Sequence, residues 1–286
     1  MAPHAVMWSG GKDSALATWR ALRRGLELGC LLNFYDAASG RIRFHATRRE
    51  LIGAQAVRIG MPLRQYGTSW EEFEATFRAA LARLRDDGFA GVVLGDIHLA
   101  DVRAWYEERV RGAGLEHVEP IWGEPPPSLL REIVDSGFRA VVTCCETAKL
   151  DGAWLGRIVD PSFAEDIARV PIDPCGENGE YHSFAFAGPL FSEPVPWTAG
   201  EVRGEAGFLQ LDLLDARDAV ALAVDETISL DPALVAAVHA RRPKAWGTLA
   251  ARGVLAYRER AGRAPDDAER RAIWDALWRR AEGFRG

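Results

Sequence analysis

The sequence has few cysteines and no long apolar run. Four cysteines among 286 residues, two of them adjacent, do not make a disulfide framework. No stretch of 18 apolar residues occurs, and residues 1–11 lack the apolar segment of a signal peptide. Since 48% of the residues are hydrophobic, the chain has enough apolar surface for a sizeable core. We therefore expect a globular protein of the reducing cytoplasm, with no membrane partner.

Lysine is also scarce, and charge is spread unevenly. Three lysines accompany 32 arginines, and the formal net charge is −6. This balance argues against nonspecific nucleic-acid binding by the whole surface. Residues 241–286 differ, because they hold twelve Arg or Lys and six Asp or Glu. For this tail we expect packing against the main domain, and docking of RNA or a protein partner is the alternative.

Two common phosphate-binding patterns are missing. A Walker-type loop would need glycine at position 6, which is Val6, and Ser or Thr at position 13, which is Asp13. The dinucleotide pattern G-x-G-x-x-G is absent as well. Any nucleotide must therefore be held by a different kind of loop.

Short apolar runs alternate with helical patterns through the first 150 residues. Strand-like runs occupy 5–8, 28–35, 91–96 and 140–146, with weaker ones at 62–66 and 116–121. Helical patterns lie at 13–25, 48–60, 70–87, 99–113 and 126–137. The alternation predicts an α/β fold, a Rossmann-like parallel sheet with helices on both faces. Ligands of such sheets bind at the carboxyl ends of the strands.

The stretch SGGKDS, residues 9–14, follows the first predicted strand and opens the first predicted helix. Glycines let the backbone approach an anion, and the N–H groups of a helix's first turn point at it. The stretch resembles SGGxDS, the PP-loop of the ATP pyrophosphatases of the adenine nucleotide alpha hydrolase type, at all six positions. The resemblance implies an ATP site that grips the β and γ phosphates. Its residues would be Ser9, Gly10, Gly11, Lys12, Asp13 and Ser14.

A narrower resemblance covers residues 5–191. The segments GVVLGDIHLADVRAWYEERV (91–110), EPIWG (119–123) and DPCGENGEYHSFAFAGPLF (173–191) are similar to the diphthine ammonia ligase family. The family implies that a small-molecule or protein carboxylate attacks the α-phosphorus of ATP, with Mg²⁺ present. Pyrophosphate then leaves, and ammonia converts the acyl-adenylate to an amide and AMP. Residues 192–286 carry no motif of this kind.

The turn GENGEYHSF carries two carboxylates three residues apart, Glu177 and Glu180. Such a pair suits Mg²⁺, a substrate amine or general-base chemistry, although an exposed acidic turn before a strand would look the same. Asn178 and His182 depart from the GEGGEYET of the family's archaeal and eukaryotic members, so the acceptor is left open. We expect Asn178, Tyr181 and His182 to contact substrate.

The resemblance also implies roles. Lys12, Asp13, Glu177 and Glu180 would be catalytic, with Lys12 on the leaving pyrophosphate and Asp13 as the residue for Mg²⁺ or for loop architecture. We expect the Lys12 side chain to be exposed in its loop.

Further candidates are weaker. Asp96 ends a predicted strand at the ligand-binding edge, and Arg103 lies about two helical turns on, so both are substrate candidates, although Asp96 also suits a helix cap. His45 and His98 could line the site or be packed or solvated. For the cysteines Cys144, Cys145 and Cys175 we expect structural roles.

Two other functions use similar features. A PP-loop enzyme that modifies tRNA would need the same loop, with the basic tail as an RNA contact. A nucleotide-binding regulator would need the fold without the chemistry. The missing C-x-x-C pairs disfavour the first, and the intact loop with its acidic turn disfavours the second.

These patterns divide the chain into three parts. Residues 1–150 would bind ATP, 151–200 would carry the substrate turn, and 201–286 would be a largely helical appendage. Helices are expected at 231–242 and 266–284, the latter with one apolar stripe of Ile273, Trp274, Leu277, Trp278 and Ala281. A homodimer stays open.

Overall fold

The structure is a computed structural model that describes residues 2–261 and 263–283, without the side chains at 216–218 and 260. It divides into two compact units. The first runs to Val195 and includes Val202–Asp212, and the second holds Pro196–Glu201 and the chain from Leu213 on. The predicted division at residues 150 and 200 separated an ATP-binding part, a part with the substrate turn and an appendage. That functional division stays a prediction.

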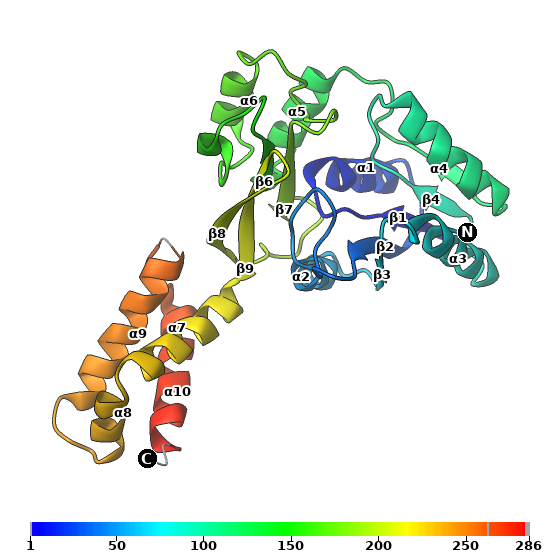
Figure 1. Ribbon diagram of the computed structural model, residues 1–286. Coiled ribbons are helices and arrows are strands. Elements are labelled where there is room, and N and C mark those ends of the chain that lie inside the picture. The colour runs from blue at the N-terminus through cyan, green and yellow to red at the C-terminus, as the bar shows by residue number, and fades with distance from the viewer. Residues whose placement is uncertain (1, 262, 284–286) are drawn as a thin grey trace. The chain divides into compact units, whose positions relative to one another are not determined.

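A five-stranded parallel sheet is the frame of the first unit (Figure 1). Its order is β3-β2-β1-β4-β5, so the central strand β1 lies between β2 and β4. Chain order therefore reverses at β1, whose carboxyl end is the switch point where such sheets bind ligands. The strands are β1 (His4–Met7), β2 (Leu28–Asp36), β3 (Leu63–Thr68), β4 (Gly91–Val93) and β5 (Glu116–Val118).

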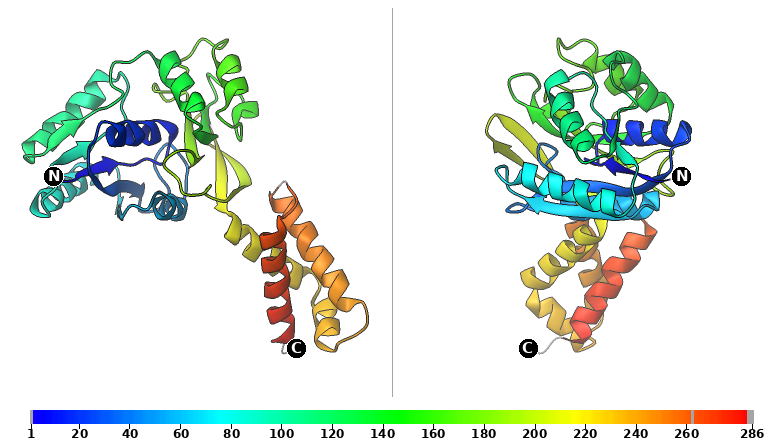
Figure 2. Two further views of the ribbon diagram at one scale, coloured as in Figure 1. Left: turned by 180° about the vertical axis from the view of Figure 1, so that it is seen from behind. Right: turned by 90° about the vertical axis from the view of Figure 1, so that its right-hand side faces the viewer.

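Helices cover both faces of this sheet, as predicted (Figure 2). Alternate strand residues point to opposite sides. Val6 and Leu31 pack with Leu16 in one core, and Ala5 and Leu32 belong to another that includes residues of α3 and α4. The crossover helices are α1 (Lys12–Arg23), α2 (Arg49–Ile59), α3 (Phe73–Asp86) and α4 (Ala100–Gly112). The predicted α/β class is confirmed.

A second sheet is antiparallel in its β6/β7 and β6/β9 pairs, and it corrects one prediction. The strand predicted at 140–146 is β6 (Arg139–Glu146), which belongs to this sheet in the order β7-β6-β9-β8 and not to the parallel one. A fully buried apolar strand looks the same in either kind of sheet, so the run alone could not decide. Its neighbours are β7 (Tyr181–Ala187), β8 (Trp197–Glu205) and β9 (Phe208–Asp215).

Three short helices complete the first unit. They are α5 (Pro126–Asp135), the 3-10 turn η1 (Gly152–Trp154) and α6 (Pro161–Ile167). Proline stands at the start of both α5 and α6, where its missing N–H is not needed. The side chain of Asp160 also caps α6 by accepting from Phe163 N.

The second unit is mainly helical. Asp266 and Glu269 form a reciprocal capping box at the start of its last helix, which supports the helix predicted there. Ile273 and Leu277 are buried, but Trp274 and Trp278 are 39% and 40% exposed, so the predicted single stripe is wrong for the tryptophans. The helices are α7 (Ala216–Leu230), α8 (Pro232–His239), α9 (Ala245–Ala261) and α10 (Asp267–Glu282).

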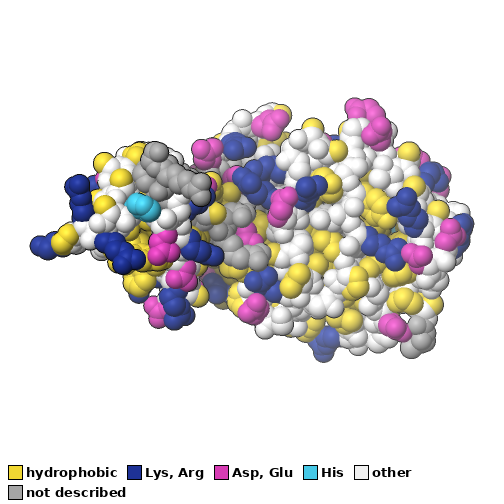
Figure 3. All heavy atoms as spheres, turned by 90° about the horizontal axis from the view of Figure 1, so that it is seen from below, with side chains coloured by type: hydrophobic (Ala, Val, Ile, Leu, Met, Phe, Trp, Pro, Cys, Tyr) yellow, Lys and Arg dark blue, Asp and Glu magenta, His cyan; other side chains and the backbone are white. Residues whose placement is uncertain are grey.

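The molecular surface carries both signs of charge. On the face drawn in Figure 3, basic and acidic side chains are interspersed. Within the described residues, no helix has the length and apolar character needed to cross a membrane.

The packing of α10 predicts two different mutational costs. Leu277→Ala leaves a cavity in a closed core and should lower the free energy of unfolding by about 2–5 kcal/mol. Trp274→Ala, one turn away on an exposed position, should cost about 1 kcal/mol or less. Urea denaturation followed by circular dichroism measures both. A larger loss for Trp274→Ala would contradict this packing.

Candidate active site

The phosphate loop lies between the end of β1 and the start of α1. Gly10 has φ +85°, and a Cβ atom there would lie only 2.5 Å from Ile52 Cδ1, so this position requires glycine. Gly11 N donates to Ser9 Oγ over 3.2 Å, and Ser14 Oγ donates to Gly11 O over 3.0 Å. The loop is thus a closed turn that leads into a helix N-terminus, the end that favours an anion.

Strand β7 is hydrogen-bonded to this loop. Ala185 N donates to Gly10 O over 2.8 Å, and Lys12 N donates to Ser183 Oγ over 3.3 Å. Gln55 of α2 is fully buried, and its Nε2 donates to Gly10 O over 2.9 Å and to Ala185 O over 2.6 Å. Sequence reasoning missed Gln55 and Ser183, because neither lies in a phosphate-binding motif. An amide on the apolar face of a predicted helix was the one available signal for Gln55.

Lys12 is not exposed as expected, since its side chain has a relative accessibility of 2%. Its Nζ donates to Asp13 Oδ2 over 2.9 Å and to the carbonyl of Cys175, and it lies 4.7 Å from the centre of the Tyr181 ring. Burial is the largest influence on Lys12 and lowers its pKa, but the charge of Asp13, the hydrogen bond to it, and the neighbouring Tyr181 and Cys175 together raise the pKa by more, so the ammonium is permanent. Lys12 therefore joins the phosphate loop to the turn at 173–181.

The acidic turn is ordered by hydrogen bonds to both carboxylates. Glu177 Oε1 accepts from Ile97 N over 2.9 Å, which fixes the turn to the loop after β4. Glu180 is buried, and its Oε1 accepts from Asp173 N and Asn178 Nδ2, each over 3.3 Å. Its other oxygen, Oε2, is buried without a hydrogen-bond partner among the described residues. The structure thus brings the two predicted carboxylates into one turn beside Lys12.

Burial makes the nearby carboxyls easy to protonate. It raises the pKa of Glu177 to about 7 and that of Asp96 to about 6, and the charge of Asp13 adds to both shifts. The loop after β4 therefore brings Asp96 into the same electrostatic field as the phosphate loop and the turn. No group of three His, Cys, Asp or Glu side chains set to hold a metal ion occurs in the described part of the chain.

Two histidines adjoin the phosphate loop. His45 Nδ1 lies 3.0 Å from Ser183 O, and a Cβ atom at Gly11 would lie 2.8 Å from His45 Cε1. The ring of His182 is 4.8 Å from that of His45, centre to centre. The structure therefore places both residues at the loop, where the sequence had left the position of His45 open.

Arg103 and His98 are tied to other residues. Arg103 Nε lies 2.7 Å from the buried Glu119 Oε2, and its guanidinium carbon is 4.5 Å from the centre of the Trp122 ring. His98 Nε2 lies 2.5 Å from Asp173 Oδ2, whose hydrogen bond raises the pKa of the imidazole. His98 thus forms a second link between the loop after β4 and the acidic turn. Glu119, which sequence reasoning missed although EPIWG had been noted, holds Arg103.

The cysteines are buried free thiols. Burial raises the pKa of Cys144 and Cys145 to about 12. Cys175 Sγ donates to Pro126 O over 3.2 Å, and burial raises its pKa too. Thiols with raised pKa values are poor nucleophiles, in keeping with the structural roles expected.

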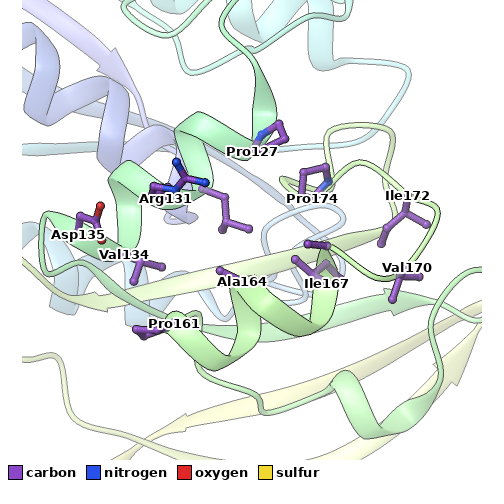
Figure 4. Close-up of a pocket in the computed structure, with 12 residues that line it drawn as sticks. Pro127, Arg131, Val134, Asp135, Pro161, Ala164, Ile167, Val170, Ile172 and Pro174 are labelled. Atoms are coloured by element: carbon purple, nitrogen blue, oxygen red, sulfur yellow. The ribbon is translucent and has the colours of Figure 1, made fainter.

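Two cavities lie in the first unit. One cavity of about 510 Å³ lies between α5 and α6 (Figure 4). Pro174, in the segment just before the acidic turn, forms part of its wall. Its lining is mostly apolar, with Arg131 and Asp135 as charged members. A second of about 530 Å³, lined by Phe44 and Trp70 among others, lies at the carboxyl ends of β2 and β3.

The buried amide of Gln55 predicts a local stability effect. Gln55→Leu leaves Trp8 Nε1, which donates to Gln55 Oε1 over 2.8 Å, without this partner. The free energy of unfolding should fall by about 1–3 kcal/mol or more. Gln65→Leu, at a half-buried amide on β3, is the control and should cost less. Equal losses in guanidinium denaturation would contradict a special role for Gln55.

Comparison with known proteins identifies the family of the chain. The model of the diphthamide synthase N-terminal domain matches residues 2–117, and that of its C-terminal domain matches 125–211. The human diphthine–ammonia ligase is 25% identical over 223 residues, covering 69% of this chain and 84% of the relative. The ligase of Rattus norvegicus is 24% identical over 217 residues, covering 67% and 81%. Since the two domain models together cover more than two thirds of the chain, it belongs to the diphthamide synthase family, which includes diphthine–ammonia ligases.

Proposed function

We propose that the protein is an ATP-dependent ligase that makes an amide from a carboxylate and ammonia, with ATP cleaved to AMP and pyrophosphate. The observation that carries this proposal is the junction of the SGGKDS loop with β7, the strand that begins directly after the acidic turn. One element would hold the nucleotide and the other the acceptor. The relatives named diphthine–ammonia ligase support the ligase class.

The phosphate loop would hold the leaving pyrophosphate. Backbone N–H groups at the start of α1 and the permanent charge of Lys12 favour the charge that develops on the leaving group. Since Lys12 is already bonded to Asp13 and Cys175, we expect it to act from this fixed position. The residues assigned to ATP are Ser9, Gly10, Gly11, Lys12, Asp13 and Ser14.

Asp13 fits the Mg²⁺ that would accompany ATP. Its Oδ1 is buried without a hydrogen-bond partner among the described residues, and carboxylate oxygens are preferred Mg²⁺ ligands. Bound there with ATP, Mg²⁺ would neutralise phosphate charge.

The acidic turn would serve the acceptor and the amine. Attack of ammonia on the acyl-adenylate forms the C–N bond, releases AMP and frees one proton. Glu177 is suited to accept that proton, because burial raises its pKa to about 7. Glu180 would hold the acceptor through its unpaired Oε2. Asp96, Arg103, Asn178, Tyr181 and His182 stay candidate substrate residues, although Tyr181 OH is engaged by Pro174 O over 2.7 Å.

Neither alternative function is favoured, since the related proteins are named as ligases. A cytoplasmic location stays a prediction, and the identity of the acceptor and a homodimer stay open.

The site of ATP cleavage tests the proposal directly. Incubation with ATP, Mg²⁺, ammonium and a pool of carboxylate metabolites should release AMP and pyrophosphate, because the loop is of the pyrophosphatase type. Chromatography of the nucleotides separates the products. Accumulation of ADP and phosphate during turnover would overturn the assignment.

Lys12 should matter for both turnover and stability. Lys12→Ala removes a charge from the leaving-group site, so turnover should fall by one to several orders of magnitude. It also leaves the Cys175 carbonyl without this donor, so the free energy of unfolding should fall by about 1–3 kcal/mol. Lys244→Ala, in the helical unit, is the control. Rates measured well below the melting temperature separate the two effects, and unchanged turnover would remove Lys12 from the site.

A further inference from the structure

The segment between β2 and α2 has a strained backbone. Phe44 has φ +63° and Ala46 has φ +56°, values in the left-handed region that side chains other than glycine rarely adopt. Each costs about 1–2 kcal/mol. The Phe44 side chain is also 60% exposed, so burial of that ring does not explain the strain. The residue between the two strained positions is His45.

A buried carboxylate clamps both ends of this segment. Arg41 Nη1 donates to Asp212 Oδ1 over 2.8 Å, and Arg48 donates to the same carboxylate over 3.0 and 2.7 Å. Burial opposes ionisation, but hydrogen bonds from Arg48 and Arg41 lower the pKa of Asp212 to about 2. The clamp therefore holds at all physiological pH values and offsets the strain between its ends.

The strained backbone places the His45 ring next to the phosphate loop, where it pairs with the His182 ring. His45 Nδ1–H donates to Ser183 O, which leaves Nε2 as the nitrogen that can gain a proton. His182 lies beside His45, and Phe44 stacks on His182 with ring centres 5.9 Å apart. Because a Cβ atom at Gly11 would clash with His45, the imidazole touches the glycine over which an anion would lie.

We propose that His45 and His182 form a proton-coupled contact for the polyphosphate of ATP, in which the pair takes up a proton when the nucleotide binds. This inference rests on the proposed function, since it needs an ATP loop. A protonated Nε2–H would donate a charge-assisted hydrogen bond to a phosphate oxygen. The two rings are so close that one proton suits the pair and two would repel.

The surrounding charges set the direction of the effect. The charges of Asp13 and Lys12 act on the pKa of His45, and those of His45 and Lys12 act on the pKa of His182. Burial lowers the pKa of both imidazoles, so the pair is neutral at pH 7 without ligand. An incoming polyanion raises the pKa of the pair. Binding must then strengthen as pH falls and be accompanied by proton uptake.

Calorimetry with Mg²⁺ and a nonhydrolysable ATP analogue tests this. Titration at pH 7 in two buffers of different ionisation enthalpy gives the number of protons taken up. The wild-type protein should take up a measurable fraction of a proton, and His45→Asn should lose most of that uptake. The affinity of His45→Asn should be roughly tenfold or more below wild type at pH 6.5 and nearer to it at pH 8.5.

Four comparisons isolate the imidazole pair. His239→Asn is the matched control, because His239 Nδ1 also donates to a backbone carbonyl, that of Ala281, within the helical unit. Glu177→Gln removes the contribution of the acidic-turn carboxyl, whose pKa burial raises to about 7, and Glu119→Gln does the same for the carboxyl beside Arg103, whose pKa burial also raises to about 7. His182→Asn gives a second test if His45→Asn fails to fold, as judged by its melting temperature.

The outcomes are distinct. Proton uptake by His45→Asn or His182→Asn equal to that of the wild type would overturn the pair's role, as would wild-type binding without net uptake. Uptake lost only in Glu177→Gln or only in Glu119→Gln would assign the proton to that carboxyl and likewise overturn it. A folded wild-type protein that binds no nucleotide would contradict the proposed function itself, and this inference with it.

Discussion

The carbonyl of Gly10 is the point at which the two halves of the site are joined. It accepts from Ala185 N of β7 and from Gln55 Nε2 of α2, residues far apart in the chain. A glycine-rich loop has little side-chain packing of its own, so its conformation must be fixed by its backbone groups. Because Ala185 and Ser183 of β7 are among those partners, the loop and the strand after the acidic turn cannot move independently. The segments proposed to bind the nucleotide and the acceptor are thereby held at one spacing.

This junction explains why β6 is not in the parallel sheet. Strand β7 runs along the phosphate loop and pairs antiparallel with β6, which in turn pairs with β9. Had β6 continued the parallel sheet, its neighbour would not have brought the turn at 173–180 to Lys12. Asp212, at the end of the same unit, also holds the segment with His45 through Arg41 and Arg48. The antiparallel sheet thus holds the phosphate loop through β7 and the segment with His45 through Asp212 of β9. These contacts join residues far apart in the sequence.

What could be predicted from the sequence was local. The periodicity of apolar residues predicted the strands of the parallel sheet and the helices between them, although it also assigned residues 140–146 to that sheet. SGGKDS and GENGEYH predicted the two segments that meet. The burial of Lys12 could not be predicted, because it depends on a carbonyl 163 residues away. Gln55 lies in no motif, and Ser183 and Glu119, although they lie in the noted segments, act through partners in other elements, which the segments themselves do not reveal. The left-handed φ of Phe44 had no signal either, since neither it nor its neighbours are glycine.

The charge balance of the site limits how it can work. Three carboxyls, those of Asp13, Asp96 and Glu177, share one field with the Lys12 ammonium, which already pairs with Asp13. Burial raises the pKa of Glu177 to about 7, so the site tolerates negative charge poorly. A polyphosphate adds several more negative charges to the same space. It can bind only if compensation arrives with it, as a metal ion, as protons on carboxyls or imidazoles, or as both. Catalysis at this site would therefore depend on the binding of cations and protons as well as on that of the nucleotide.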